Sequence, residues 1–274
     1  MPITTIVIVS DLHAGCQMGL CPKLVRRDFG GEYTRSAAQA VVWRWWETFW
    51  SDFVPAVTQG EDFTVLVNGD LVDGVHHGST TQISHNMSVQ RDLAERILAP
   101  VHDKCRGSFF VVRGTPAHAG ESSEDEESIA RYVGSIPDQV GQYARPELWI
   151  RVGDFLVHAM HHVGGTSSNR TEANALMAEM GEEFAWAGRI GEQAPDVVIR
   201  SHRHCNIEVN GPTPKGRFYS FSTSGWQLKT PFVYKIAGGR IAPPQFGGSV
   251  VRVGKQGLET HHFTKMVKRA KAVG

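Results

Sequence analysis

The chain has 274 residues, enough for one large α/β domain or for one domain with a small appendage. Its 41% hydrophobic and 20% charged residues exclude a disordered or fibrous protein, because so many apolar side chains can form a sizeable core. The 28 basic and 28 acidic residues give a formal net charge of zero, which excludes a global field that would attract nucleic acid or an anionic membrane.

The apolar run at residues 3–9 is far shorter than the roughly 18 residues that a membrane span needs. No basic segment precedes it, as one would in a signal peptide. We therefore expect a cytoplasmic protein without a membrane partner, and no sequence feature points to a protein partner. The four cysteines show no Cys-x-x-Cys spacing and are expected to be reduced thiols.

Three runs in the first half predict buried strands, at residues 3–10, 63–68 and 108–113. Helical periodicity at residues 36–54 and 88–105 separates them. This β-α-β-α-β order predicts parallel pairing of the three strands. Each run leads into a polar loop that contains Asp or His, so we expect these side chains at the carboxyl edge of the sheet.

The helix predicted at residues 36–54 carries more aromatic side chains than one helical face can hold, among them Trp43, Trp46 and Trp50. Burial between the sheet and a flanking layer explains this stripe. A surface for a partner or for stacked bases is the alternative.

Acidic residues at positions 121–127 predict the start of another helix, which extends to residue 133. Ser122 or Ser123 would be its N-cap, with solvated carboxylates in the first turn. A metal site is the alternative explanation of this acidic cluster.

The second half is rich in strand-like segments and contains a helix predicted at residues 171–187. The predicted strands are residues 148–152, 155–162, 197–200, 207–209, 217–223, 232–236, 250–253 and 259–263. Since no repeat or low-complexity linker separates the two halves, we expect a single domain over residues 1–264. Residues 265–274 form a basic C-terminal tail, which is solvated or, alternatively, contacts nucleic acid.

Residues that can bind metal follow the predicted strands in a fixed order. They are Asp11-x-His13, Gly69-Asp70-x-x-Asp73, the segment Gly114 to His118, His161-His162 and His202-x-His204. Carboxylate oxygens and imidazole nitrogens together suit Zn, Mn or Fe, and they outnumber the ligands of one tetrahedral ion. Two ions about 3.5 to 4 Å apart are the usual arrangement for hydrolysis of phosphate esters. On an extended chain, one residue between two ligands lets both side chains point the same way, so the first and last motifs are expected to act as pincers.

This order of motifs resembles the calcineurin-like metallophosphoesterase superfamily, over residues 5–225. The resemblance implies a four-layer α/β/β/α sandwich, in which two mixed β-sheets are flanked by helices and a dinuclear metal centre lies at the sheet edge. The implied ligands of the first metal are Asp11, His13 and His204, with Asp70 as the bridge to the second. The implied ligands of the second metal are His202 and one of His161 or His162.

The third motif departs from the family pattern of Gly-Asn-His, in which the Asn is a ligand and the His protonates the leaving group. Thr115 takes the Asn position here, as a weak ligand or a support of the other ligands. The second metal would then bind loosely, through water, or with help from a residue such as Asn86. His118 lies two residues later than the family's His, and we expect it to reach the same place and act as the general acid. A loop histidine with no catalytic part is the alternative.

Neighbouring residues on a strand point to opposite faces, so only one of His161 and His162 is expected to bind metal, and His161 is favoured. Asp73 is expected to orient a histidine ligand of the first metal or to cap the next segment. His76 and His77 follow in the same loop and are candidates for substrate contact, with exposed loop residues as the alternative.

These residues predict a metal-dependent phosphoesterase with two divalent ions, Mn being preferred over Fe or Zn. The ions would lower the pKa of water toward neutrality, so that it can attack phosphorus. Gly74 stands where the Ser/Thr protein phosphatases of the superfamily carry Arg, which disfavours that activity. A phosphodiester, either nucleic acid or a nucleotide, is the preferred substrate. A phosphomonoesterase for a small metabolite and a catalytically silent metal-binding scaffold are the alternatives.

Overall fold

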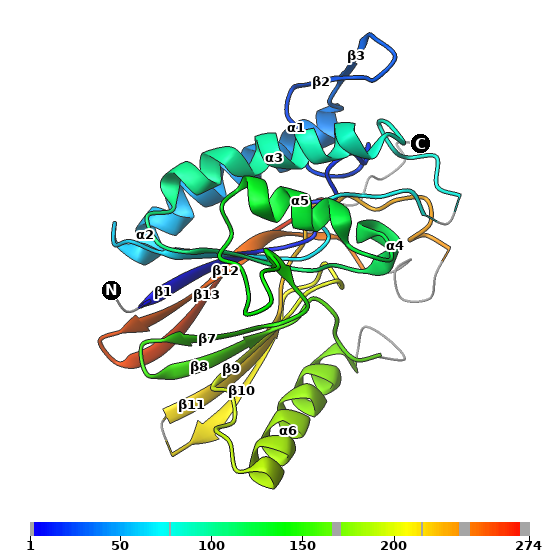
Figure 1. The fold of residues 1–274 in the computed structure, drawn as a ribbon. Coiled ribbons are helices and arrows are strands. Elements are labelled where there is room, and N and C mark those ends of the chain that lie inside the picture. The colour runs from blue at the N-terminus through cyan, green and yellow to red at the C-terminus, as the bar shows by residue number, and fades with distance from the viewer. Residues whose placement is uncertain (1–2, 77, 166–170, 215, 236–241, 269–274) are drawn as a thin grey trace, which may run out of the picture.

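Two stacked β-sheets form the centre of the molecule, and helices cover the outer face of each sheet (Figure 1). The computed structural model describes residues 3–76, 78–165, 171–214, 216–235 and 242–268. This arrangement confirms the expected four-layer α/β/β/α sandwich of two mixed sheets.

The first sheet has six strands and contains the three strands predicted in the first half of the chain. In spatial order they are β13 (Gly257–Met266), β12 (Gln245–Gly254), β1 (Thr5–Val9), β4 (Thr64–Asn68), β5 (Phe109–Val112) and β6 (Ala144–Arg145). Strands β1, β4 and β5 are parallel, as predicted, and β12 pairs with β1 in the antiparallel direction. The carboxyl ends of the parallel strands therefore meet at one edge.

The second sheet has five strands, with antiparallel pairs at both of its edges. In spatial order they are β10 (Ile207–Thr213), β11 (Gly216–Ser222), β9 (Val197–Arg200), β8 (Phe155–Ala159) and β7 (Leu148–Val152). Strand β8 ends earlier than predicted, so His161 and His162 lie beyond the strand. The strand predicted at residues 232–236 is wrong, because residues 231–235 form turns.

Alternating side chains of the first sheet belong to different cores. On β1, Val7 and Val9 pack toward the helices, whereas Ile6 and Ile8 pack toward the second sheet, and all four are fully buried. Since successive side chains of a strand point to opposite faces, a continuous apolar run can fill both cores.

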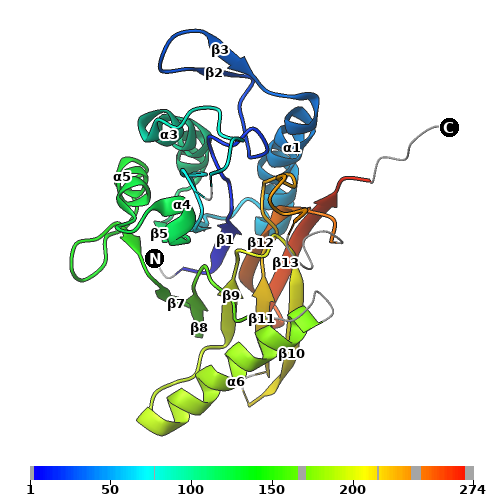
Figure 2. The same cartoon turned by 90° about the vertical axis from the view of Figure 1, so that its right-hand side faces the viewer.

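Several helices cover the first sheet, and one long helix covers the second (Figure 2). The first group is α1 (Ala37–Thr48), the π-helical turn η1 (Phe49–Phe53), α2 (Val54–Thr58), α3 (Met87–Lys104), α4 (Pro116–Ala119) and α5 (Glu124–Tyr132). Helix α6 (Glu172–Ile190) packs Leu176 against Ile207 and Val209 of β10. A small hairpin, β2 (Leu24–Arg26) and β3 (Glu32–Thr34), projects beside α1 and was not predicted.

The aromatic stripe of α1 and η1 is part of the core, as the burial interpretation predicts. Trp46, Phe49 and Trp50 are at most 5% exposed. Trp226, from the far end of the chain, is fully buried and its ring centroid lies 4.9 Å from that of Trp46. These contacts fix the segment after β11 against the helical layer.

Strand β13 extends to Met266, into the segment predicted as a basic tail, and residues 269–274 lie outside the described part of the chain. Among the described helices, none combines the length and apolarity needed to cross a lipid bilayer.

Candidate metal centre

The residues of the candidate site lie in loops that follow the strands at one edge of the two sheets. Asp11, Asp70, His202 and His204 come shortly after β1, β4 and β9. These four and His13 have positive φ angles between 45° and 67°, and they are five of the seven non-glycine residues of this kind among those described. Left-handed backbone at non-glycine residues is uncommon and is concentrated at functional sites.

The two motifs that were expected to act as pincers on an extended chain are not extended, so this part of the prediction is wrong. In each motif, the first and third residues are both left-handed, with φ of 54° and 45° for Asp11 and His13 and of 67° and 48° for His202 and His204. The tight loop, not an extended chain, brings their side chains toward the site.

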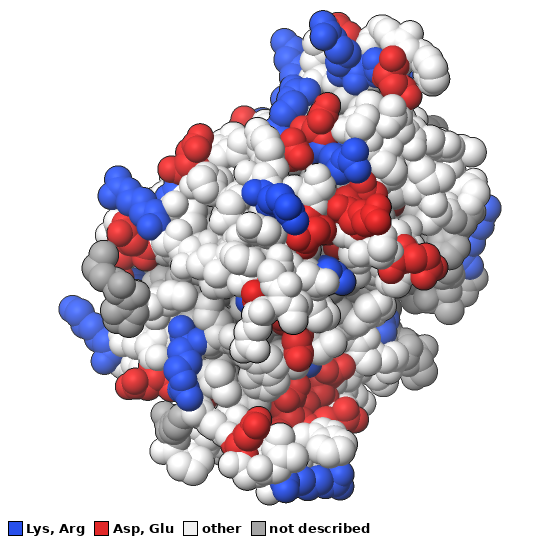
Figure 3. Space-filling model, viewed as in Figure 1, with Lys and Arg blue, Asp and Glu red and all other residues white. Residues whose placement is uncertain are grey.

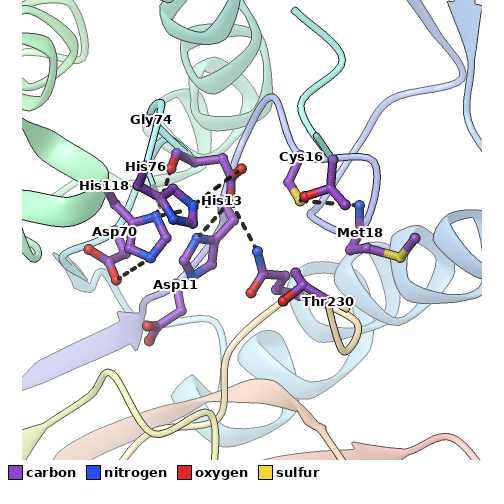
Figure 4. Close-up of polar contacts among 12 residues, drawn as sticks. Asp11, His13, Cys16, Met18, Asp70, Gly74, His76, His118 and Thr230 are labelled. Carbon is purple, nitrogen blue, oxygen red and sulfur yellow. Dashed lines mark hydrogen bonds and ion pairs between the residues drawn. The ribbon is translucent and has the colours of Figure 1, made fainter. Parts of the chain in front are cut away.

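The first group of possible metal ligands contains Asp11, His13 and His204, whose ligand atoms lie within 4.8 Å of one another. The Nε2 atom of His204 is 3.1 Å from Oδ1 of Asp11 and 3.2 Å from Nε2 of His13. Asp11 and His13 are buried. Figure 4 shows Asp11 and His13 beside Asp70, in the part of the site that is also approached by His76 and His118.

The second group contains Asp70, His161 and His202, again within 4.8 Å. His161 donates from Nδ1 to the carbonyl of Asn68 at 2.6 Å, which leaves Nε2 facing Oδ2 of Asp70 at 3.1 Å. Nδ1 of His202 is 3.9 Å from the same oxygen. His162 is exposed, whereas His161 is buried and belongs to this group of possible ligands.

The two groups adjoin, and their chemistry suits cations. Nε2 of His161 lies 3.8 Å from Oδ1 of Asp11 and so links the groups. Both side-chain oxygens of Asp11 and Oδ2 of Asp70 are buried and accept no well-aligned hydrogen bond, and the groups that face them are imidazoles, with Nε2 of His204 and of His161 each at 3.1 Å. Buried carboxylate oxygens without well-aligned hydrogen bonds are costly unless a cation faces them. This donor set therefore fits divalent metal ions.

The pKa values of His161 and Asp11 also indicate that the buried carboxylates of the site stabilise positive charge. Burial lowers the pKa of His161, but the charges of Asp70 and Asp11 outweigh it and raise this pKa to about 10. Burial raises the pKa of Asp11, but the charges of His204 and His161 dominate and lower it to about 2. The negative charge of the buried carboxylates thus stabilises cations at this edge.

Thr115 supports the carboxylate of Asp70. Its backbone N–H and its hydroxyl both donate to Oδ1 of Asp70, at 2.7 and 3.1 Å. Asn86, the residue considered as a substitute ligand, is exposed and its side chain accepts a hydrogen bond from the N–H of Ser88 at the start of α3. The Asn86 side chain thus caps α3, and its assistance to the metal stays a prediction.

His118 lies in the short helix α4 and faces the site. Its Nδ1 is 2.7 Å from the carbonyl oxygen of Asp73, to which it donates, and its Nε2 is 4.0 Å from Oδ2 of Asp70. Burial, followed by the charge of His13, lowers the pKa of His118 to about 4. The Pro-Ala insertion thus brings His118 to the metal-binding residues, despite its later position in the motif.

Asp73 lies behind the first group of ligands. Its Oδ1 is 3.4 Å from Nδ1 of His13, and its two oxygens accept hydrogen bonds from Gln82 at 2.8 Å and Gln227 at 3.1 Å. Burial raises the pKa of Asp73, but hydrogen bonds from His13 and His76 hold it well below its ordinary value. This geometry matches a carboxylate that orients His13.

Of the two candidate substrate contacts, His76 is beside the site and His77 lies outside the described residues. The ring centroid of His76 is 4.4 Å from that of His118, and its Nε2 is 3.8 Å from Asp73. His76 also lines the cavity above the metal-binding residues.

Glu126 is a component of the site that sequence reasoning missed. The acidic start of α5 was expected to be solvated and capped by Ser122 or Ser123, but Ser123 has φ of 54° and makes no side-chain cap. Glu126 is fully buried and accepts hydrogen bonds from the N–H groups of Leu71 at 3.1 Å and Gly114 at 2.7 Å. Burial raises its pKa to about 7.

A second missed component is a buried chain of polar side chains that joins four strand ends. The hydroxyl of Thr223 is 2.7 Å from the hydroxyls of both Ser10 and Ser201. The side-chain amide of Asn68 donates to Ser201 at 2.6 Å and to the carbonyl of Met160 at 2.9 Å. These bonds fix the two sheets to each other beneath the metal-binding loops. Small hydroxyl residues within apolar strands were the only available sequence signal.

A cavity of about 730 Å³ opens above the site. Beside the histidines, its wall contains the segment from Gln227 to Val233 and residues 242–244, which no motif had indicated. Cations in this wall are Arg203 and Lys229 among the described residues.

No family model and no curated protein matches the chain. Similar solved structures include Vacuolar Protein Sorting 29 from Cryptosporidium parvum, with a TM-score of 0.40 and 11% identity over 97% of this chain and 100% of that chain. They also include a metallophosphoesterase from Sphaerobacter thermophilus, with a TM-score of 0.39 and 11% identity over 94% of this chain and 88% of that chain. The layers and strand order give this chain the fold that its resemblance to the calcineurin-like metallophosphoesterases implies.

Proposed function

We propose that the protein is a metal-dependent phosphoesterase that hydrolyses phosphodiesters with two divalent ions. The observation that carries this proposal is the pair of adjoining ligand groups, one around Asp11 and one around Asp70, in which buried carboxylate oxygens face the imidazole nitrogens of His204 and His161. Nitrogen and carboxylate ligands suit Mn, Fe or Zn, and we propose Mn.

Each ligand group would hold one ion. The proposed ligands of the first ion are Asp11, His13 and His204, and those of the second are His161 and His202, with Asp70 between them. When bound, such ions lower the pKa of water toward neutrality and neutralise charge on the phosphoryl oxygens. Asp73 would keep His13 in the orientation that the ion requires.

We propose that His118 protonates the oxygen of the leaving group. The hydrogen bond from its Nδ1 to the carbonyl of Asp73 fixes the ring, so that Nε2 is the atom that faces the site. Burial keeps the free imidazole mainly neutral at pH 7. An anionic phosphate beside the ring favours its charged form, and substrate binding would therefore supply the acid.

Apart from the two proposed metal ions, the described residues of the cavity wall contribute only the cations Arg203 and Lys229, which favours a diester over a monoester. A phosphomonoester carries about two negative charges at neutral pH, whereas a diester carries one. Arg203 already lies 3.6 Å from Glu172. On the face shown in Figure 3, acidic and basic side chains of the described residues are interspersed.

The test is hydrolysis of bis-(p-nitrophenyl) phosphate and of p-nitrophenyl phosphate, with metal content measured on the same samples. We expect Mn-dependent turnover that prefers the diester, and two bound ions per chain. In His202→Ala the loss should be about 100-fold or more, above the range typical of residues that only support ligands. His261→Ala is the matched control, because His261 lies on β13 and pairs with Glu259.

Preference for the monoester would support the metabolite phosphatase instead. Two bound ions with no turnover of either ester would support a silent metal-binding scaffold. Failure to bind metal would overturn the proposal.

A further inference from the structure

The cavity is lined by apolar side chains as well as by the candidate metal ligands. These apolar residues, here called the apolar wall, are Val163, Leu228, Phe232, Val233, Pro243 and Pro244. Since these residues and the candidate ligands line the same cavity, a substituent of the substrate can reach this wall while the phosphate lies at the site.

The wall is fixed to the site by the chain that follows β11. The N–H of Trp226 donates to the carbonyl of Asp11 at 2.9 Å, and the N–H of Leu228 donates to the carbonyl of Met18 at 2.7 Å. Between them, Gln227 donates to Asp73 at 3.1 Å. The buried indole of Trp226 anchors this segment in the core. The wall therefore begins at a fixed position beside the first ligand group.

Phe232 is the large aromatic side chain of this wall. It is 45% exposed and lines the cavity. The turn that carries it is closed by a hydrogen bond from the N–H of Val233 to the carbonyl of Thr230, at 3.1 Å, and from the N–H of Lys235 to the carbonyl of Phe232, at 2.9 Å. Figure 4 places Thr230 on the side of His13 that faces away from His118. An aromatic ring that lines a cavity and is partly exposed to it can stack on a flat group.

We propose that this apolar wall is a subsite for a flat aromatic substituent of the phosphodiester, such as a nucleobase, which stacks on Phe232. The proposal rests on the phosphodiesterase function and specifies the substrate class of the same site. The segment that carries Leu228 and Phe232 runs beside the first ligand group, and Figure 4 shows Thr230 of this segment on the side of His13 opposite His118. The subsite therefore takes the substituent that stays on phosphorus, and the leaving group departs toward His118.

The experiment compares two diesters that share the p-nitrophenolate leaving group, namely p-nitrophenyl phenyl phosphate and p-nitrophenyl methyl phosphate. We expect the wild-type protein with Mn to prefer the phenyl ester. In Phe232→Ala the ratio of kcat/KM for the phenyl ester to that for the methyl ester should fall about tenfold, as for loss of a stacked base. Any intrinsic difference between the esters cancels when two variants are compared.

Tyr234→Ala is the matched control. Tyr234 belongs to the same turn segment and is 56% exposed, but it does not line the cavity. We expect the ester ratio to be unchanged in this variant. An equal fall in both variants would assign the effect to the fold of the segment and overturn the subsite.

Binding of phenylphosphonate and methylphosphonate to the Mn-loaded protein separates this proposal from the phosphodiesterase function. If neither diester is hydrolysed, that function fails, but a preference for phenylphosphonate that disappears in Phe232→Ala still supports the subsite. Equal binding of the two phosphonates by the wild-type protein, or an unchanged preference in Phe232→Ala, would overturn it.

Discussion

Thr115 holds one oxygen of Asp70 with two hydrogen bonds, while the other oxygen of Asp70 faces His161. Thr115, which takes the position where the family motif has an Asn ligand, thus orients the carboxylate of Asp70, which we propose to lie between the two ions. Charge-assisted hydrogen bonds are stronger than those between neutral groups, so this support fixes the direction of the free oxygen.

Replacement of the Thr115 hydroxyl should weaken the metal centre without unfolding the protein. Thr115→Val keeps the shape and the backbone hydrogen bond but removes the hydroxyl donor, and we expect about a tenfold loss of Mn affinity from one charge-assisted bond. Isothermal titration calorimetry with Mn checks this. Thr115→Ser keeps the hydroxyl and should retain the affinity; equal losses in both variants would contradict the role of the bond.

Glu126 should act on metal binding through the loops that it joins. Its two oxygens accept from the N–H groups of Leu71 and Gly114, next to Asp70 and Thr115. In Glu126→Gln an amide N–H faces one of these donors, and we expect Mn affinity to fall about tenfold, within the range for residues that support ligands.

The neighbouring Glu127 provides the matched control for this change. It also accepts from two backbone N–H groups, those of Tyr143 and Ala144, but these belong to the approach to β6. Glu127→Gln should therefore lower the melting temperature without changing Mn affinity. If both variants bind Mn like the wild type, the proposed positioning by Glu126 is wrong.

His118→Ala should slow the hydrolysis of esters with poor leaving groups much more than that of esters with good leaving groups. A poor leaving group, such as an alkoxide, needs a proton in the transition state, so its hydrolysis should fall by about 100-fold or more. Hydrolysis of a p-nitrophenyl ester should fall much less, because p-nitrophenolate departs without a proton. The measurement is kcat for a paired alkyl and p-nitrophenyl diester at constant metal content. Equal losses for the two esters would exclude His118 as the acid.

The stabilising effect of Glu127 should depend on pH. Burial raises the pKa of Glu127, but the hydrogen bonds from the backbone N–H groups of Ala144 and Tyr143 and the contact with Arg131 together outweigh burial and lower this pKa below the ordinary 4.5. A lowered pKa in the folded state means that the unfolded state binds more protons as pH falls. The stabilisation is thus complete above pH 4.5 and is lost as pH falls through the folded-state pKa.

Glu127→Gln should accordingly lower the free energy of unfolding by about 1 kcal/mol at pH 7, the size of a typical hydrogen-bond loss. The difference from the wild type should shrink below pH 4.5. Urea unfolding of the metal-free protein over a range of pH values checks this. A difference that stays constant with pH would assign the effect to packing.

The positions of the candidate ligands were predictable because local signals mark them. A buried strand run followed by Asp or His identifies the carboxyl edge of a parallel sheet, and this holds for Asp11 and Asp70. The left-handed backbone at these residues was not predictable, since Asp and His usually adopt other conformations.

Glu126 and Phe232 illustrate what local patterns omit. An acidic residue near a helix start usually interacts with solvent and the helix dipole, and nothing near Glu126 in the sequence identifies Leu71 and Gly114 as its partners. Phe232 lies in an apolar run typical of a strand, but its segment forms turns beside the cavity.

The sequence by itself determined the parallel strands, the helical layer and the order of metal-binding motifs, because these depend on periodicity and on residues close together in the chain. The tertiary structure decided which distant groups meet. It brings His161 to Asp70, Gln227 to Asp73 and Trp226 to Trp46. The reason is physical: such contacts depend on how two sheets and their loops pack together, and no short stretch of chain contains both partners.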